Sequence, residues 1–182
     1  MRHVPNRLGR PVGARLAALA TLSTASLLTF GAAGVAAARL PDVTVKVDHA
    51  ILRVEGSAGA DSILLRVRPN ETGVVQVLAD GRQVGNVDRD RFRAIDVRAG
   101  AGNDSILVDE SFGVFTNLPT TIDGGDGSDV LVGDIGPVQL VGGAGNDVLL
   151  GGDSVDDLLG GDGNDTIDGN KAADVAFGGD GN

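Results

Sequence analysis

Short runs of β-forming residues, separated by turn-forming residues, fill the chain from residue 42 to residue 122. The clearest runs are VTVKV (43–47), SILLRV (62–67), VVQVLA (74–79) and FRAIDV (92–97). These runs are rich in β-branched residues and tend to alternate apolar with polar positions, which is typical of strands with one buried face. Asp80-Gly81, directly after the third run, predicts a two-residue hairpin turn. Residues 39–122 are therefore predicted to be a β-rich N-terminal region of short strands.

From Gly124 onward the pattern of apolar and polar positions repeats every nine residues without an insertion. The units are GGDGSDVLV (124–132), GDIGPVQLV (133–141), GGAGNDVLL (142–150), GGDSVDDLL (151–159), GGDGNDTID (160–168), GNKAADVAF (169–177) and GGDGN (178–182). In each complete unit, six residues rich in glycine and aspartate predict a tight turn, and three further residues predict a short strand. Because strand neighbours point to opposite faces, the eighth residue is predicted to point inward and the seventh and ninth outward.

Two consecutive nine-residue units, such as 124–132 and 133–141, form one coil, read as turn, strand, turn, strand. Stacked coils of this kind form two parallel sheets around a thin aliphatic core. In such a stack, alternate units lie on the same edge of the molecule.

Residues 1–38 have a different character from the rest of the chain. Arg2, Arg7, Arg10 and Arg15 are followed by 23 uncharged residues (16–38) that end in three alanines. This order predicts a secretory signal peptide and therefore an extracellular, secreted protein. An uncleaved membrane anchor is the alternative, because about 20 apolar residues can span a bilayer.

Composition and charge exclude several classes of function. The chain has 25 acidic and 15 basic residues, and all of the acidic residues follow residue 38. So acidic a chain is not expected to bind nucleic acid, whose phosphates carry the same charge. The absence of cysteine excludes disulfides, thiolate metal sites and cysteine nucleophiles. His49 is the one histidine after the leader, which argues against histidine-dependent hydrolysis and histidine-rich metal sites.

Three units contain the full pattern of glycines and aspartate in their first six residues: GGDGSD, GGAGND and GGDGND, ending at Asp129, Asp147 and Asp165. They resemble the calcium-binding nonapeptide G-G-x-G-x-D-x-U-x of RTX (hemolysin-type) proteins. The resemblance implies an all-β fold: a parallel β-roll over 123–182, a two-sheet solenoid with two nonapeptides per coil, preceded by the short-stranded region. Weaker echoes occur at 56–64 (GSAGADSIL) and 99–107 (AGAGNDSIL).

The resemblance also implies Ca²⁺ ions between successive turns on one edge, held by carboxylates and turn carbonyls. One site is expected between turns 124–129 and 142–147, and a second between 142–147 and 160–165. The expected ligand residues are Gly124, Gly125, Gly127, Asp129, Gly142, Gly143, Gly145, Asp147, Gly160, Gly161, Gly163 and Asp165. Further candidates are Asp126, Asp162, Asp180 and Asp104. The sequence stops at Asn182, where the next residue of the pattern is Asp, so we expect a roll truncated at its C-terminus.

The units on the other edge depart from the pattern. Val138 replaces the aspartate of the first unit, and Ser154 replaces the fourth-position glycine of the second. In the third unit, Asn170 and Ala172 replace the second- and fourth-position glycines, and Lys171 stands between them. The sequence therefore predicts one edge that holds calcium and an opposite edge that is largely empty.

The function that these features predict is that of a secreted calcium-binding protein in which the ion drives folding of the roll. The chain contains neither H-E-x-x-H nor G-x-S-x-G, and no enzyme activity is expected. The expected partners are calcium ions, with no membrane contact after signal cleavage; a protein or cell-surface partner stays undefined. Two alternatives remain open: a non-catalytic part of a larger secreted enzyme, or a cell-surface adhesin. The adhesin alternative rests on two features: a basic patch in which Arg89, Arg91 and Arg93 are predicted to share one strand face, and apolar residues at outward strand positions. These outward residues are Val132, Val141, Leu150, Leu159 and Phe177.

Overall fold

The computed structural model describes residues 42–181 apart from 69–70, 72, 111–117 and 134. The predicted leader, 1–38, lies outside the described residues. The described part of the chain is built from strands and one 3-10 helix, η1 (Arg89–Arg91). It contains no helix of the length and apolarity needed to cross a bilayer.

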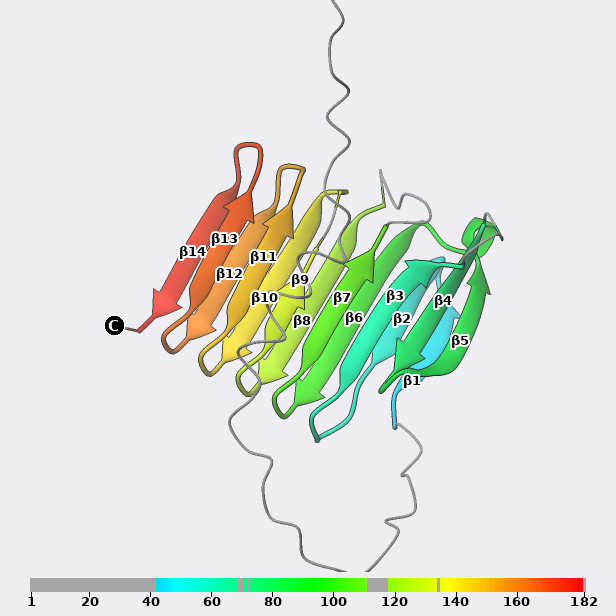
Figure 1. Cartoon of the computed structure of the whole chain (residues 1–182), viewed down its shortest axis with the longest axis horizontal. Helices are drawn as coiled ribbons and strands as arrows, with labels where there is room; N and C mark the ends of the chain where they lie inside the picture. Colours follow the sequence, from blue (N-terminus) through cyan, green and yellow to red (C-terminus); the bar gives the residue numbers. More distant parts are fainter. Residues whose placement is uncertain (1–41, 69–70, 72, 111–117, 134, 182) are drawn as a thin grey trace, which may run out of the picture. The chain divides into compact units, whose positions relative to one another are not determined.

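The described residues form two seven-stranded sheets (Figure 1). Sheet A has the strand order β1-β2-β6-β8-β10-β12-β14, and sheet B the order β13-β11-β9-β7-β3-β4-β5. In chain order the strands are β1 (Thr44–Asp48), β2 (Ile51–Glu55), β3 (Ser62–Val67), β4 (Val74–Ala79), β5 (Arg82–Asp88), β6 (Ala94–Ala101), β7 (Ser105–Asp109), β8 (Thr120–Asp126), β9 (Val130–Val132), β10 (Val138–Ala144), β11 (Val148–Gly152), β12 (Asp157–Asp162), β13 (Thr166–Asn170) and β14 (Val175–Asp180).

From β8 onward the chain winds alternately between the two sheets, and neighbouring strands in each sheet are parallel. In sheet A, Leu140 lies opposite Ile122 on one side and Leu158 on the other, so each coil spans two nonapeptide units. This register confirms the predicted parallel β-roll.

The N-terminal region continues the same two sheets with longer coils. Val97 of β6 lies opposite Ile122 of β8, and Val54 of β2 lies opposite Val97, so both pairs are separated by more than two nonapeptides of sequence. The boundary expected between residues 122 and 123 falls inside β8, and Leu40–Asn182 is one compact unit. The short-stranded region and the roll therefore share one solenoid.

The two extra segments of the longer coils, 68–93 and 110–119, both follow a strand of sheet B and precede a strand of sheet A. We call the edge at which they occur the insertion edge; farther along the chain it contains the turns 133–138, 151–156 and 169–174. The other edge, where each sheet A strand passes into sheet B, is the repeat edge. Its turns are 56–61, 99–104, 124–129, 142–147 and 160–165, and none of them carries an insertion.

The segment 68–93 contains the antiparallel strands β4 and β5. The predicted hairpin turn between them is confirmed, since Asp80 and Gly81 both have positive φ (50° and 72°). The predicted strand face of arginines is wrong, because Arg89–Arg91 form η1. Phe92 is fully buried directly after this helix, and the guanidinium groups of Arg89 and Arg93 both donate to its carbonyl oxygen.

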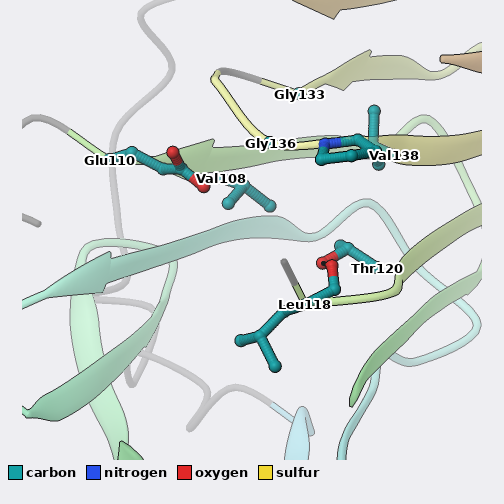
Figure 2. Close-up of a pocket in the computed structure, with 8 residues that line it drawn as sticks. Val108, Glu110, Leu118, Thr120, Gly133, Gly136 and Val138 are labelled. Carbon is teal, nitrogen blue, oxygen red and sulfur yellow. Dashed lines mark hydrogen bonds between the residues drawn. The ribbon is translucent and has the colours of Figure 1, made fainter. Parts of the chain in front are cut away.

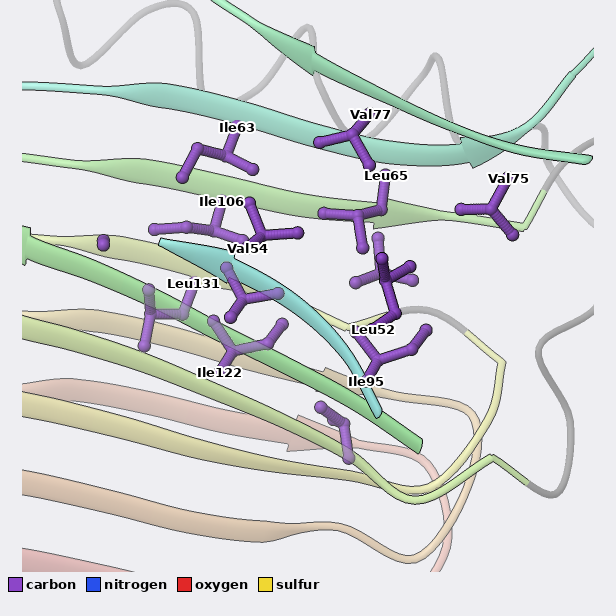
Figure 3. Packing of buried hydrophobic residues seen from close by; sticks show 14 of the residues in the cluster. Leu52, Val54, Ile63, Leu65, Val75, Val77, Ile95, Ile106, Ile122 and Leu131 are labelled. Atoms are coloured by element: carbon purple, nitrogen blue, oxygen red, sulfur yellow. The ribbon is translucent and has the colours of Figure 1, made fainter. Parts of the chain in front are cut away.

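The core lies between the two sheets and is filled by inward-pointing aliphatic side chains (Figure 3). At the eighth position of the repeat, Leu131, Leu140, Leu149 and Leu158 are each at most 1% exposed, as predicted. Ile167 is only partly buried and Ala176 is exposed, because no further coil packs on their strands in the described chain.

Candidate metal centre

The turns of the repeat edge are joined by a ladder of hydrogen bonds through aspartate side chains. In each step, Oδ1 of one aspartate accepts the backbone N–H of the aspartate one coil earlier. The pairs are Asp61 N to Asp104 Oδ1 (2.7 Å), Asp104 N to Asp129 Oδ1 (2.7 Å), Asp129 N to Asp147 Oδ1 (2.8 Å) and Asp147 N to Asp165 Oδ1 (2.9 Å). We call these five residues the aspartate ladder; the turns that carry them form the lower row in Figure 1.

The second carboxylate oxygen of four ladder members has no hydrogen-bond partner. These buried oxygens are Oδ2 of Asp104, Asp129, Asp147 and Asp165. A buried carboxylate oxygen without a partner destabilises the fold, since it has lost its hydrogen bonds to water. The arrangement fits a bound cation, which would supply the missing interaction.

The first glycine of each turn leaves room for oxygens from two stacked turns. A Cβ atom placed on Gly124 would lie 2.3 Å from Asp129 Oδ2 and 2.7 Å from the carbonyl oxygen of Gly142. The corresponding distances at Gly142 are 2.4 Å to Asp147 Oδ2 and 2.4 Å to the carbonyl oxygen of Gly160. A carboxylate of one turn and a carbonyl of the next therefore approach the same point, and Ca²⁺ takes oxygen ligands of both kinds.

The second and fourth positions of the turn, both glycine, allow the turns to stack closely. Gly143 and Gly145 have φ values of +111° and +135°, a conformation that glycine adopts without steric cost. A Cβ atom on Gly145 would lie 1.9 Å from the carbonyl oxygen of Gly127 in the preceding coil. A side chain at this position would push the turns apart and disturb the carbonyl oxygens between them.

Burial raises the pKa values of two carboxylates in the aspartate ladder, Asp129 and Asp147. Burial, with smaller contributions from the charges of Asp104 and Asp147, raises the pKa of Asp129 to about 6. Burial also raises the pKa of Asp147, and the Asp165 carboxylate adds to this effect. Negative charge is therefore disfavoured at Asp129 and Asp147, and a cation beside these two carboxylates would lower their pKa values again.

Carboxylates alone do not make a metal site here. Within the described ranges, no three acidic or histidine side chains come together at one point. A Ca²⁺ ion takes about six to eight oxygen ligands. Most ligands in this roll must therefore be backbone carbonyls of the stacked turns, with one ladder carboxylate from each turn.

The third-position aspartates occupy a different environment. Asp126, Asp162 and Asp180 have exposed side chains and do not join the ladder. Their backbone carbonyls accept the N–H groups of Gly102, Gly145 and Gly163, each at 2.7 Å. The structure thus places Asp104 in the aspartate ladder with the main ligand candidates. The side chains of Asp126, Asp162 and Asp180 lie outside the ladder.

Comparison with known families agrees with this geometry. The model of the RTX calcium-binding nonapeptide repeat matches the chain in four copies, over residues 123–158, 139–167 and 150–182. Residues 123–182 are RTX calcium-binding repeats. Calcium is therefore the cation that fits the turns. No curated protein and no solved structure matches the chain.

The insertion edge of the RTX region also carries carboxylates. Asp156 Oδ1 accepts the N–H of Val138 (2.9 Å), and Asp174 Oδ1 accepts the N–H of Asp156 (3.0 Å). Asp156 Oδ2 is buried without a partner, and burial raises the pKa of this residue to about 6. Units 151–159 and 169–177 both keep the sixth-position aspartate, and this residue accounts for the shared geometry although Ser154 replaces a glycine. Whether this edge holds calcium stays a prediction.

Two features distinguish this edge from the repeat edge. Val138 stands where a ladder aspartate would be and, with Val108 and Leu118, lines a small pocket (Figure 2). The turn 133–138 therefore offers no carboxylate at its sixth position. Farther along this edge, Lys171 Nζ lies 2.7 Å from Asp153 Oδ2. This ion pair joins turn 151–156 to turn 169–174.

Proposed function

We propose that this chain is an exported, non-catalytic protein whose RTX region folds into the β-roll when it binds Ca²⁺ outside the cell. The observation that carries the proposal is the column of buried, unpartnered carboxylate oxygens at the repeat edge. In the RTX region, each of these oxygens lies in a stacked glycine turn whose repeat belongs to a calcium-binding family.

Charge gives the ion its role in folding. Residues 124–182 contain 12 aspartates and one lysine, and folding brings many of these carboxylates together. A ligand that binds only the folded state stabilises it, by about 4 kcal/mol when its concentration is a thousand times its Kd. Calcium binding therefore supplies folding free energy that the thin leucine core of the repeats lacks.

Export is supported by the leader rather than by the folded part. Residues 1–38 have the order of a signal peptide: arginines, an uncharged stretch and small residues. The chain without cysteine also suits an oxidising compartment in which free thiols are a liability. On this proposal, the roll stays loose at the low calcium concentration of the cytosol and folds after export.

The absence of catalysis is supported by the use of the acidic residues. The buried aspartates accept backbone N–H groups of neighbouring turns, so they hold the solenoid together. His49, the remaining histidine after the leader, lies on the surface beside Asp48. The sequence of the chain contains none of the hydrolase motifs named above.

Calcium titration of the full chain tests the folding role. Circular dichroism should show a gain of β signal in millimolar calcium and not in the same concentration of magnesium. Asp147→Ala should lower the number of bound ions by two, because this turn contributes to both expected sites. Unchanged spectra together with no bound calcium would contradict the proposal.

Analysis of the expressed protein tests export separately. Cells that produce the chain should release a form whose N-terminal sequence begins after residue 38. A protein retained in the cytosol with its leader intact would overturn this part of the proposal.

A further inference from the structure

We propose that the roll holds a further calcium ion between turns 99–104 and 124–129, one coil before the matched repeats. This inference rests on the proposed function, because it assumes that turns of this geometry bind calcium. The family match begins at residue 123 and leaves the turn 99–104 outside it. Four features of this turn equal those of the RTX turns.

The first feature is the backbone of the turn. Gly100 and Gly102 have φ values of +111° and +117°, in the same left-handed region as the glycines of the RTX turns. Cβ atoms placed on Gly125 and Gly127 would lie 2.0 Å and 1.8 Å from the carbonyl oxygens of Gly100 and Gly102, respectively. Within the RTX region, the matching distances from the second and fourth positions of turn 142–147 are 2.1 Å and 1.9 Å. The carbonyls of turn 99–104 are therefore stacked as in the repeats.

The second feature is the hydrogen bond between turns. Gly102 N–H donates to the carbonyl of Asp126 at 2.7 Å. Gly127 N–H donates in the same way to the carbonyl of Ala144, also at 2.7 Å. The turn 99–104 thus joins turn 124–129 by the contact that joins the RTX turns to one another.

The third feature is a ladder formed by the side chains at the fifth position. Asn103 Oδ1 accepts the N–H of Ser128 at 2.9 Å. In the RTX region, Asn146 Oδ1 accepts the N–H of Asn164 at 2.7 Å. Because the same contact joins neighbouring turns in both places, the gap between turns 99–104 and 124–129 is equivalent to the gap between RTX turns.

The fourth feature is the carboxylate. Asp104 is 2% exposed, its Oδ1 accepts the N–H of Asp61, and its buried Oδ2 has no hydrogen-bond partner. This is the condition of Asp129 and Asp147 in the RTX turns. A buried, unpartnered carboxylate oxygen in a turn whose carbonyls stack against the next turn points to a cation.

The preceding turn, 56–61, lacks several of these features, so we expect no calcium ion between it and turn 99–104. Asp61 Oδ2 already accepts the N–H of Ser57 at 2.7 Å. Neither Ser57 nor Gly59 has a positive φ, and Ala60 offers no polar side chain at the fifth position. Turn 56–61 keeps a first-position glycine, Gly56, close to Asp61 Oδ2 and to the carbonyl oxygen of Ala99. It lacks the positive-φ residues, the polar fifth position and the unpartnered carboxylate oxygen of the calcium turns, so Asp61 is a matched control within the aspartate ladder.

One residue of turn 99–104 departs from the repeat. Ala99 stands at the first position, where the RTX turns have glycine, and its methyl group is buried. This methyl takes up space that the glycines of the other turns leave beside the carboxylate. We therefore expect calcium to bind here more weakly than in the repeats.

Counting bound ions on the full chain tests the inference. Native mass spectrometry at saturating calcium should show one ion fewer on Asp104→Asn than on the unaltered chain. Asp61→Asn, the control, should bind the same number as the unaltered chain. Both variants keep the volume of the side chain and an oxygen that can accept a hydrogen bond. An Asp104→Asn chain that binds the full number of ions would overturn the inference.

The same measurement separates this inference from the proposed function. If the unaltered chain binds no calcium, both fail. If Asp147→Asn loses ions and Asp104→Asn does not, only the further site is refuted. Should Asp104→Asn fail to fold, anomalous diffraction from calcium-grown crystals of the unaltered chain decides. A calcium peak between turns 99–104 and 124–129 is expected, and an empty gap there beside occupied RTX turns would overturn the inference.

Discussion

The first coils and the last coils of the solenoid share the same two sheets and differ in what fills them. In β2, β3 and β6, inward positions carry fully or almost fully buried side chains such as Leu52, Leu65 and Ile95. The antiparallel strands β1, β4 and β5 extend the two sheets at this end. In β13 and β14, by contrast, Ile167 is half-buried and Ala176 is exposed.

The repeat edge shows the reverse gradient. Asp61 Oδ2 accepts a backbone N–H of its own turn, whereas Oδ2 of Asp129, Asp147 and Asp165 is buried without a partner. The change from a turn satisfied by the protein to turns suited to an ion occurs between Asp61 and Asp104, whose Oδ2 is also buried without a partner. Because each coil of a solenoid contacts only its neighbours, one chain can combine a part stabilised by apolar burial with a part stabilised by metal.

Removal of calcium should produce the largest difference in stability between the first and the last coils. With a chelator, hydrogen exchange should become fast in β10 to β14 and stay slow in β2, β3 and β6, because the latter keep their apolar core. Mass spectrometry of exchanged peptides measures both parts in one sample. Equal loss of protection at the two ends would refute the division.

Core truncations at the two ends should come next. Leu65→Ala removes a fully buried side chain and should cost about 3 kcal/mol of unfolding free energy. Ile167→Ala, at a half-buried position, should cost about 1 kcal/mol. Urea unfolding of the calcium-loaded chain measures both, and a larger cost for Ile167→Ala would reverse the comparison.

A pair of glycine substitutions tests the close stacking of the RTX turns. Gly145→Ala should cost about 2 kcal/mol or more, because φ is +135° and the new methyl would lie 1.9 Å from a backbone carbonyl oxygen. Gly178→Ala is the control: no atom lies within 4 Å of its added methyl and its φ is not positive. Calcium-dependent melting temperatures should fall for the first variant only. Equal shifts would show that close stacking is not required.

The smallest effect is a dependence on pH that differs in sign with and without metal. Asp129 and Asp156 have folded pKa values raised to about 6 by burial, so the folded chain binds their protons more tightly than the unfolded chain does. This contribution is fully present below pH 3.8 and is lost as pH rises through about 6. In chelator, the loose roll should therefore gain β signal in circular dichroism as the pH falls from 7 to 5, because protonation of these carboxylates favours the folded state.

With calcium present, the direction should reverse, because protons compete with the ion for the same carboxylates. Calcium affinity measured by titration calorimetry should fall between pH 7 and pH 5. Asp156→Asn should reduce the pH dependence of the metal-free chain. A metal-free chain that loses stability between pH 7 and pH 5 would contradict the assignment of these raised pKa values.

The sequence predicts the RTX region well because its nine-residue period is uninterrupted. The period places Leu140 opposite Leu158 and points both inward, and the structure has this register. Each unit combines a turn that only glycine fits with a single inward leucine, so local and long-range preferences agree.

Before residue 120 the sequence shows echoes of the repeat at 56–64 and 99–107, but the fixed spacing between units is lost. Insertions change the spacing of equivalent aspartates to 25 residues between Asp104 and Asp129 and to 43 between Asp61 and Asp104. A pattern of fixed length does not detect equivalence across insertions of different length. Only the pairing of β2, β6 and β8 brings these turns into one column.

The arginine-rich segment shows a second limit. Alternation of Arg89, Arg91 and Arg93 has the period of a strand, but burial of Phe92 and the bonds to its carbonyl favour a 3-10 turn. Packing around Phe92 overrides the local alternation of arginines, and the sequence alone does not reveal this packing.

The confinement of both insertions to a single edge suggests a use for the molecule. The coil-to-coil alignment is kept by the uninterrupted turns on the far side, so length can vary opposite them without a slip in strand pairing. A foreign peptide grafted between Ser154 and Val155 would extend from the roll at the insertion edge. This division would suit the chain as a scaffold for peptide display, because one side holds the strands in alignment and the other accepts added sequence.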